Sequence, residues 1–193
     1  LILDRTNWKW GKTPINILML SIAYKGIGLP IFWAVLNLEG NSSTDDRIAI
    51  LKRVIERFGA SRILAFTADR EFVGKEWFEF LCREQIPFII RVKGCYMASA
   101  ISSNCKVRLK TFCKGLGRKQ VLNRCVTLWG MPIYISVEKK KEAKEAMIVA
   151  SNVPFQNALE LSRKRWAIET MFGCFKTRGF HMEDTHITDP DKI

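Results

Sequence analysis

Three apolar runs at the start of the chain constrain its fold most. They cover residues 1–8, 15–24 and 29–38, and the short segment KGIG joins the second to the third. Glycines between two apolar runs are typical of a β-hairpin turn. Each run is shorter than the roughly 20 residues that a membrane-spanning helix needs. We therefore predict three antiparallel strands at the start and no helix that crosses a membrane.

The next segment, GNSSTDDRIAILKRVIERFG at residues 40–59, predicts a helix. Ser43 or Thr44 can cap its first turn, and Gly59 can end it. The apolar positions that recur at helical spacing predict a buried stripe of Ile48, Leu51, Ile55 and Phe58.

The remaining segments alternate between strands and helices. The order is strand, helix, strand, a β-rich segment, strand and one long helix, at residues 62–69, 74–85, 87–92, 93–141, 147–152 and 155–179. Lys106, Arg108 and Lys110 alternate with apolar neighbours, which predicts a strand with one cationic face. The fold class is therefore α/β, a mixed sheet interrupted by a β-rich insertion before the last helix.

The charge of the chain indicates an anionic partner. It carries 31 basic and 19 acidic residues, a net charge of +12, in 193 residues. Nucleic acid is the first interpretation and an anionic membrane surface the second. The six cysteines form no C-x-x-C pair, which favours reduced thiols in a cytosolic protein over a zinc site or a disulfide framework.

Three acidic residues are candidates for a catalytic site. Asp4 and Asp69 stand at the polar ends of expected strands, and Glu169 lies on the last helix. Carboxylates that converge at one sheet edge can hold two divalent ions, and Mg²⁺ suits such oxygen ligands. The alternative is structural: an aspartate at a strand end is often a turn or cap residue. Glu169 can equally pair with Arg165, one helical turn earlier.

Two cations flank Glu169 on the last helix. Arg165 is four residues before it and Lys176 seven after it, so the three side chains lie within about 40° of one another around the axis. Beside them runs an apolar stripe of Ile168, Met171, Phe172 and Phe175. The helix can thus pack on a sheet while Arg165 and Lys176 contact phosphates.

The blocks DRTNW at Asp4, TADREF at Asp69 and RWAIE at Glu169 resemble bacterial insertion-sequence transposases of the DDE type. The closest group, in the insertion-sequence-four family, carries the signature Y-x2-R-x3-E-x6-K. Arg165, Glu169 and Lys176 fit that spacing, while Ser162 stands at the tyrosine position. The resemblance covers essentially the whole chain.

The resemblance implies a ribonuclease-H-like fold. The catalytic core would comprise residues 1–92 and 142–193, and a β-rich insertion residues 93–141. Asp4 would ligate two Mg²⁺ ions, for which Mn²⁺ can substitute, with Asp69 on one ion and Glu169 on the other. Such enzymes free a 3′-OH at each transposon end and join it to target DNA in a cut-and-paste reaction. Double-stranded DNA, a homodimer in the synaptic complex and a place on the bacterial nucleoid in the cytoplasm are implied as well.

The implied DNA contacts have structural alternatives. In the cut-and-paste group a DNA hairpin forms, which requires a base swung out onto an aromatic side chain. Trp129 in the insertion can supply it, or it can pack in the insertion's core. Lys106, Arg108 and Lys110 can follow the phosphate backbone, or they can form a solvated face.

Two other functions fit the same sequence. One is a metal-dependent nuclease of this fold that does not transfer strands. The other is an inactive DNA-binding relic of a transposase. Because the chain begins inside an apolar run, we expect it to be a piece of a longer protein.

Overall fold

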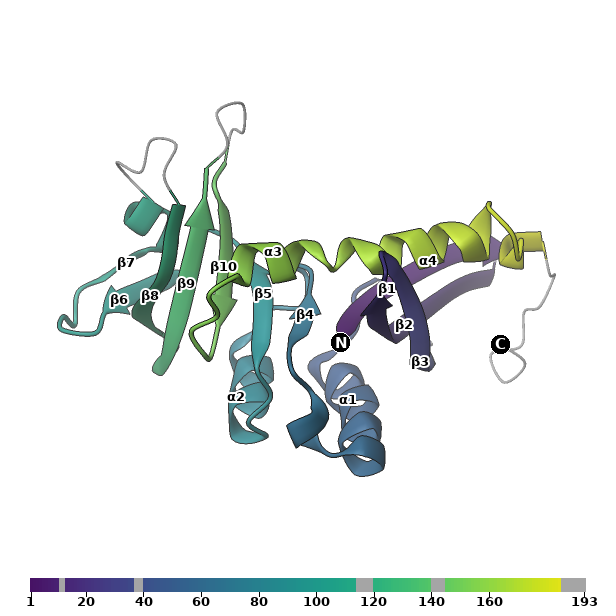
Figure 1. Ribbon diagram of the computed structural model, residues 1–193, viewed down its shortest axis with the longest axis horizontal. Helices are drawn as coiled ribbons and strands as arrows, with labels where there is room; N and C mark the ends of the chain where they lie inside the picture. The colour runs from purple at the N-terminus through teal and green to yellow at the C-terminus, as the bar shows by residue number, and fades with distance from the viewer. Residues whose placement is uncertain (11–12, 37–39, 114–119, 140–144, 185–193) are drawn as a thin grey trace. The chain divides into compact units, whose positions relative to one another are not determined.

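A computed structural model describes residues 1–10, 13–36, 40–113, 120–139 and 145–184 of the chain. These residues form two compact units. The first comprises Leu1–Arg62 and Lys164–Ile193, and the second comprises Ile63–Arg163. Both combine strands with helices (Figure 1).

The first unit is built on an antiparallel sheet of β1 (Ile2–Trp10), β2 (Thr13–Tyr24) and β3 (Ile27–Leu36). β2 lies in the middle and pairs with both neighbours. Lys25 and Gly26 connect β2 to β3 with φ angles of 47° and 83°, the left-handed backbone of a tight hairpin turn. The predicted three-stranded start is confirmed.

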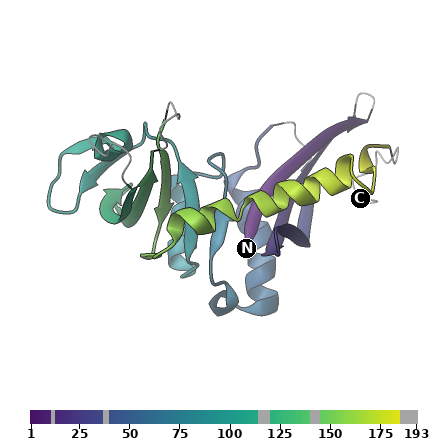
Figure 2. The same cartoon turned by 45° about the horizontal axis from the view of Figure 1, so that its top comes forward.

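Two helices cover opposite faces of this sheet, α1 (Thr44–Phe58) and α4 (Trp166–Lys176), as Figures 1 and 2 show. Successive side chains of a strand point to opposite faces. Ile17 and Met19 of β2 share a buried cluster with Ile168 of α4. Phe58 of α1 contacts Phe32 of β3, with ring centroids 6.4 Å apart. The sheet is therefore the middle layer of three.

Helix α1 begins and ends where its local signals predict. Ser43 accepts a hydrogen bond from the backbone N–H of Asp46, whose side chain accepts one from the backbone N–H of Ser43 in return. Of the four residues in the predicted buried stripe, Leu51 is buried, and the other three are not, so the buried face is rotated about the helix axis from the predicted one. The buried positions are Ile50, Leu51, Val54 and Arg47, whereas Ile48 and Ile55 are half-buried and Phe58 is 49% exposed.

Glycine at position 28 lets β3 approach α4 closely. A Cβ atom there would lie 3.1 Å from the Cα of Ile168, 3.2 Å from the carbonyl oxygen of Ala167 and 3.1 Å from the Oγ of Ser21. The first two are helix backbone atoms, so they cannot rotate away. Gly28 thus fixes how near α4 lies to the sheet.

The second unit contains a mixed sheet. β4 (Phe66–Ala68) pairs parallel to β5 (Phe88–Val92), and every further pair is antiparallel. Its order runs β4-β5-β10-β9-β8-β6-β7. The further strands are β6 (Met97–Ala100), β7 (Lys106–Arg108), β8 (Gln120–Leu128), β9 (Met131–Glu138) and β10 (Met147–Ser151).

Helices α2 (Lys75–Arg83) and α3 (Ala158–Arg163) cover opposite faces of β5. Phe78 of α2 packs against Phe88, with ring centroids 4.6 Å apart, while Leu159 of α3 shares a cluster with Ile89. Phe88 and Ile89 are neighbours on a strand and so point to opposite faces.

The predicted single helix over residues 155–179 is wrong, because it is divided into α3 and α4. The backbone N–H groups of Ala167 and Ile168 donate to the carbonyls of Lys164 and Arg165, three residues earlier, so the helical ladder restarts there. Short 3₁₀ helices lie at η1 (Ala60–Arg62), η2 (Leu109–Cys113) and η3 (Met182–Asp184).

The described part of residues 93–141 is rich in β-strands as predicted, with differences in detail. β6 was not predicted as a strand, and the expected strand with the cationic face is shorter, since η2 begins at Leu109. Residues 126–138 form two strands, joined by Trp129 and Gly130 with φ angles of 52° and 86°. No helix in the described part of the chain is long and apolar enough to cross a membrane.

Candidate active site

Helix α4 brings two of the three predicted acids together in the first unit. Its apolar stripe is buried as predicted: Ile168, Met171 and Phe172 lie in one cluster with residues of β1 and β2, and Phe175 packs against it. Because this stripe faces the sheet, the polar positions of α4 lie beside the buried stripe, at the edge of the contact between helix and sheet. Glu169 is there, in the first turn of the helix.

Asp4 lies within β1 rather than at its end, since the strand continues to Trp10. It pairs with Met19 of β2 and is 9% exposed. Met19 faces α4, so Asp4 points to the α4 side of the sheet as well. Its Oδ1 accepts a hydrogen bond of 2.8 Å from the backbone N–H of Arg5. That bond orients the carboxylate.

Arg165 joins the two acids through one nitrogen atom. Its Nη1 lies 2.6 Å from Oδ2 of Asp4 and 3.1 Å from Oε1 of Glu169. The side chains of Asp4 and Arg165 are 13% and 15% exposed, and that of Glu169 is 43% exposed. The predicted pairing of Glu169 with Arg165 is therefore present, and the same guanidinium also binds the acid of β1.

Lys176 ties the other end of α4 to the same strand. Its Nζ donates a hydrogen bond of 2.6 Å to the backbone carbonyl of Asn7. The two motif cations thus both contact β1, Arg165 at Asp4 and Lys176 at Asn7. Together they fix α4 along the strand.

Asp69 belongs to the second unit, directly after β4. It is half-buried, and its carbonyl accepts a hydrogen bond of 2.9 Å from the backbone N–H of Phe72. The predicted ligand set therefore draws on both units. Within either unit, the described residues contain no group of three or more His, Cys, Asp and Glu side chains placed to share an ion.

The donors in the first unit suit a hard divalent cation. Oδ2 of Asp4 and Oε1 of Glu169 converge on one position, which the guanidinium nitrogen occupies. Carboxylate oxygens are the ligands that Mg²⁺ and Mn²⁺ prefer. The pair therefore fits the chemistry of the metal that the sequence predicts.

Trp129 takes an unusual backbone conformation at the β8–β9 turn. A φ of 52° is uncommon for a bulky side chain. Its ring is half-buried and makes edge contacts with Phe78 and Tyr96, at centroid distances of 5.4 and 5.3 Å. A pocket of about 380 Å³ lies beside it, with Lys106 among its lining residues. The Trp129 ring thus packs against two aromatic side chains and also lines a pocket.

The other predicted contact residues lie on the surface of the second unit. Lys106, Arg108 and Lys110 are exposed, whereas Leu109 between them is buried.

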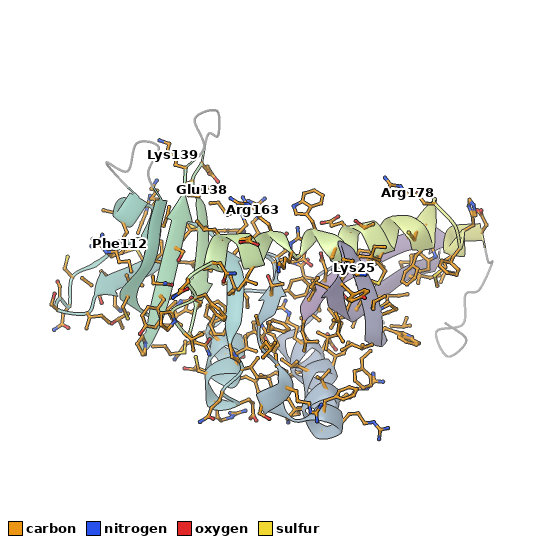
Figure 3. All side chains as sticks on the ribbon, viewed as in Figure 1. Lys25, Phe112, Glu138, Lys139, Arg163 and Arg178 are labelled. Atoms are coloured by element: carbon orange, nitrogen blue, oxygen red, sulfur yellow. The ribbon has the colours of Figure 1, made fainter. Side chains whose placement is uncertain are left out.

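Ser162, at the tyrosine position of the family signature, lies in α3 and is half-buried. Next to it, Arg163 forms an ion pair of 2.5 Å with Glu138 (Figure 3). The five cysteines whose side chains are described, Cys82, Cys95, Cys105, Cys125 and Cys174, are free thiols.

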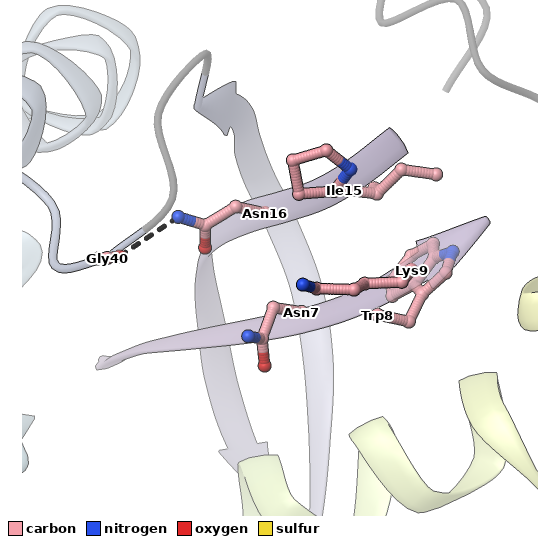
Figure 4. A pocket seen from close by; sticks show the side chains of 7 residues that line it. Asn7, Trp8, Lys9, Ile15, Asn16 and Gly40 are labelled. Atoms are coloured by element: carbon pink, nitrogen blue, oxygen red, sulfur yellow. Dashed lines mark hydrogen bonds between the residues drawn. The ribbon is translucent and has the colours of Figure 1, made fainter. Parts of the chain in front are cut away.

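Sequence reasoning missed a pocket of mixed polar and apolar lining on the other face of β1. It has a volume of about 260 Å³, and Asn7, Lys9 and Asn16 are among its lining residues (Figure 4). Asn16 donates a hydrogen bond of 3.1 Å to the carbonyl of Gly40 and accepts one from Arg5. The strand alternation in DRTNWK could have found it, because odd positions there face away from Asp4.

Fold and site together define a basic α/β domain in which a strand and a helix present paired carboxylates. The family model described as a transposase DDE domain matches residues 1–193, and the chain belongs to this family. The family-level resemblance to DDE transposases is thereby confirmed. Comparison with curated proteins finds no match.

Among solved structures, the chain is similar to the piggyBac transposase in a synaptic complex with hairpin DNA. The identity is 12% and the TM-score 0.56, over 94% of this chain and 42% of that chain. The chain therefore spans less than half the length of that protein. The likeness shows the fold, and the predicted ribonuclease-H-like mixed sheet with a β-rich insertion before the last helix is confirmed.

Proposed function

We propose that the chain is the catalytic domain of a DNA transposase of the insertion-sequence-four family, in the group with the tyrosine–arginine–glutamate–lysine signature. It would cut DNA at transposon ends and join the freed 3′-OH to target DNA. The observation that carries this proposal is the convergence of Asp4 and Glu169 on one cation position in a domain of the DDE family.

Asp4, Asp69 and Glu169 would hold two Mg²⁺ ions, or Mn²⁺ in their place. Bound ions of this kind activate an attacking water or hydroxyl and stabilise the leaving oxygen at a phosphodiester. The chain's own contribution is orientation. The backbone N–H of Arg5 binds Oδ1 of Asp4 and thereby orients Oδ2 toward α4.

Arg165 and Lys176 would bind phosphates next to the cleaved bond, since Arg165 is the N-cap residue of α4, Lys176 is its last residue, and Glu169 lies between them. The net charge of +12 favours a nucleic acid partner. The solved complex of the piggyBac transposase contains hairpin DNA, which supports DNA as the substrate of this chain as well.

In the second unit, Trp129 would stack on a base swung out of the duplex. Backbone strain at a bulky residue is often kept where a function requires it, and the pocket beside the ring offers space. Lys106, Arg108 and Lys110 would follow the phosphate backbone, because their side chains are exposed.

The division of the chain remains a proposal too. The core would comprise residues 1–92 and 142–193, and the insertion residues 93–141. Transposon ends are brought together in pairs, so the active form would be a homodimer on the bacterial nucleoid.

A cleavage assay on labelled DNA with terminal inverted repeats tests this function. Asp4→Asn, Asp69→Asn and Glu169→Gln remove one charge each with little change of shape. We expect each to lower Mg²⁺-dependent cleavage at least about a hundredfold. Asp45→Asn, at an exposed acid in the first turn of α1, is the matched control and should cleave like the wild type.

Three other outcomes decide against parts of the proposal. If all variants cleave alike, the three acids are not the site. Cleavage by the wild type without joining of the 3′-OH to target DNA would identify a nuclease. DNA binding without any cleavage would identify an inactive relic.

A further inference from the structure

The position that a metal ion would take between Asp4 and Glu169 is occupied by a side chain of the protein. Nη1 of Arg165 lies 2.6 Å from one carboxylate and 3.1 Å from the other. A divalent ion such as Mg²⁺ binds carboxylate oxygens at about 2.1 Å. An ion bound to both of these oxygens would need the position that Nη1 of Arg165 takes, so the guanidinium and a bridging ion exclude each other.

Arg165 cannot make room by losing its proton, because an arginine side chain stays charged in proteins. It has to move. Its ion pair with Asp4 is well shielded from water, with side-chain exposures of 15% and 13%. A pair that is shielded in this way interacts more strongly than one in open solvent. Displacing Arg165 without a new anionic partner would thus be unfavourable.

A phosphate group of DNA is such a partner. The guanidinium presents five N–H donors in a planar fork, which suits two oxygens of one phosphate. Among the described residues, the bonds of Arg165 to Asp4 and Glu169 are both made through Nη1. A phosphate could therefore engage the rest of the fork and draw the side chain away from the acids.

We propose that Arg165 is a positioning residue. In the absence of DNA it binds Asp4 and Glu169 and blocks the metal position between them. When DNA binds, a phosphate draws the Arg165 side chain away, and the two carboxylates can then bind the metal ion. This inference rests on the proposed function, because it takes both acids as metal ligands. Linkage makes the effect reciprocal: DNA tightens metal binding, and the metal tightens DNA binding by the same factor.

The test measures Mn²⁺ binding by electron paramagnetic resonance, without any turnover. The whole chain is titrated with Mn²⁺ alone and again with a short DNA duplex at low salt. We expect Arg165→Gln to bind Mn²⁺ about tenfold or more tightly than the wild type when DNA is absent. We also expect DNA to tighten Mn²⁺ binding to the wild type by about the same factor, but not to this variant.

Arg163→Gln is the matched control, because Arg163 pairs with Glu138, which is not a proposed ligand. It should bind Mn²⁺ like the wild type. If Arg165→Gln does not fold, Arg165→Lys replaces it. An ammonium group lacks the planar fork, so we expect the same direction with a smaller change.

The possible outcomes distinguish a failure of the Arg165 role from a failure of the proposed metal site. Suppose Asp4→Asn abolishes Mn²⁺ binding, yet the Arg165 variants bind like the wild type. The role of Arg165 is then overturned, and the metal site stands. The role is also overturned if DNA leaves Mn²⁺ binding to the wild type unchanged. If Mn²⁺ binding does not depend on Asp4 in any sample, the metal site itself is wrong.

Discussion

Replacing Gly28 with alanine tests the close approach of β3 to α4. The added Cβ would lie 3.1 Å from the Cα of Ile168 and 3.2 Å from the carbonyl oxygen of Ala167. Ordinary carbon contacts are at 3.5–4.0 Å, so the helix backbone has to shift by several tenths of an ångström. Since Glu169 follows Ile168, its carboxylate shifts as well.

The magnitude follows from two opposing terms. Overpacking a well-packed site costs about 1–3 kcal/mol, whereas replacing a strand glycine with alanine recovers about 0.5–1 kcal/mol of backbone entropy. We therefore expect Gly28→Ala to lower the free energy of unfolding by about 0–2.5 kcal/mol. At about 2–4 °C per kcal/mol, this is a fall in Tm of up to about 10 °C. Gly28→Val should cost more, because it adds two further methyl groups at the same place.

Urea denaturation followed by circular dichroism measures the effect. Gly74→Ser is the control, because a Cβ at Gly74 meets nothing within 4 Å and serine is a favourable first cap for α2. It should be as stable as the wild type or slightly more stable. An alanine variant at position 28 that is more stable than the wild type would refute the close contact.

Three further predictions concern single side chains. Asn152→Ala should lower the free energy of unfolding by about 1–3 kcal/mol, because Asn152 bonds the N–H of Phe88 and a carbonyl before it; urea denaturation measures this. Lys176→Met should lose about 0.5–1.5 kcal/mol through the bond to the carbonyl of Asn7, seen as a lower Tm. Burial raises the pKa of the Cys82 thiol, so at pH 8 iodoacetamide should label Cys82 more slowly than exposed Cys95, as read by mass spectrometry of the digested protein.

Each of these three predictions has a result that would contradict it. An Asn152 variant within about 0.3 kcal/mol of the wild type, a negligible change for a pair of half-buried hydrogen bonds, would mean that its two bonds do not hold the β5 region. An unchanged Tm for Lys176→Met would remove Lys176 from the contact with β1. Equal labelling rates would mean that Cys82 is as accessible as Cys95.

Local signals predicted those parts of the fold that depend on neighbouring residues. Ser43 and Gly59 marked both ends of α1, and the glycines of KGIG marked the hairpin. The buried face of α1 could not be predicted in this way. Ile48 and Ile55 are as apolar as Ile50 and Val54, and only the position of the sheet decides which set is covered.

The division between α3 and α4 was also beyond local reasoning. Lys164 and Arg165 are good helix formers, and neither glycine nor proline marks the break. The spacing of Arg165 and Glu169 did predict their pairing, since four residues make about one turn. The contact of Arg165 with Asp4 joins positions 161 residues apart, and only the packed structure brings them together.

The cationic strand β7 also matters for solubility. In the described part of the chain it is the last strand of its sheet and pairs on one side, with β6. Exposed strand edges invite edge-to-edge association between molecules, and lysine and arginine side chains discourage it. Neutral substitutions at Lys106 and Arg108 would therefore promote aggregation even where no phosphate is contacted. Light scattering has to accompany any binding measurement on them.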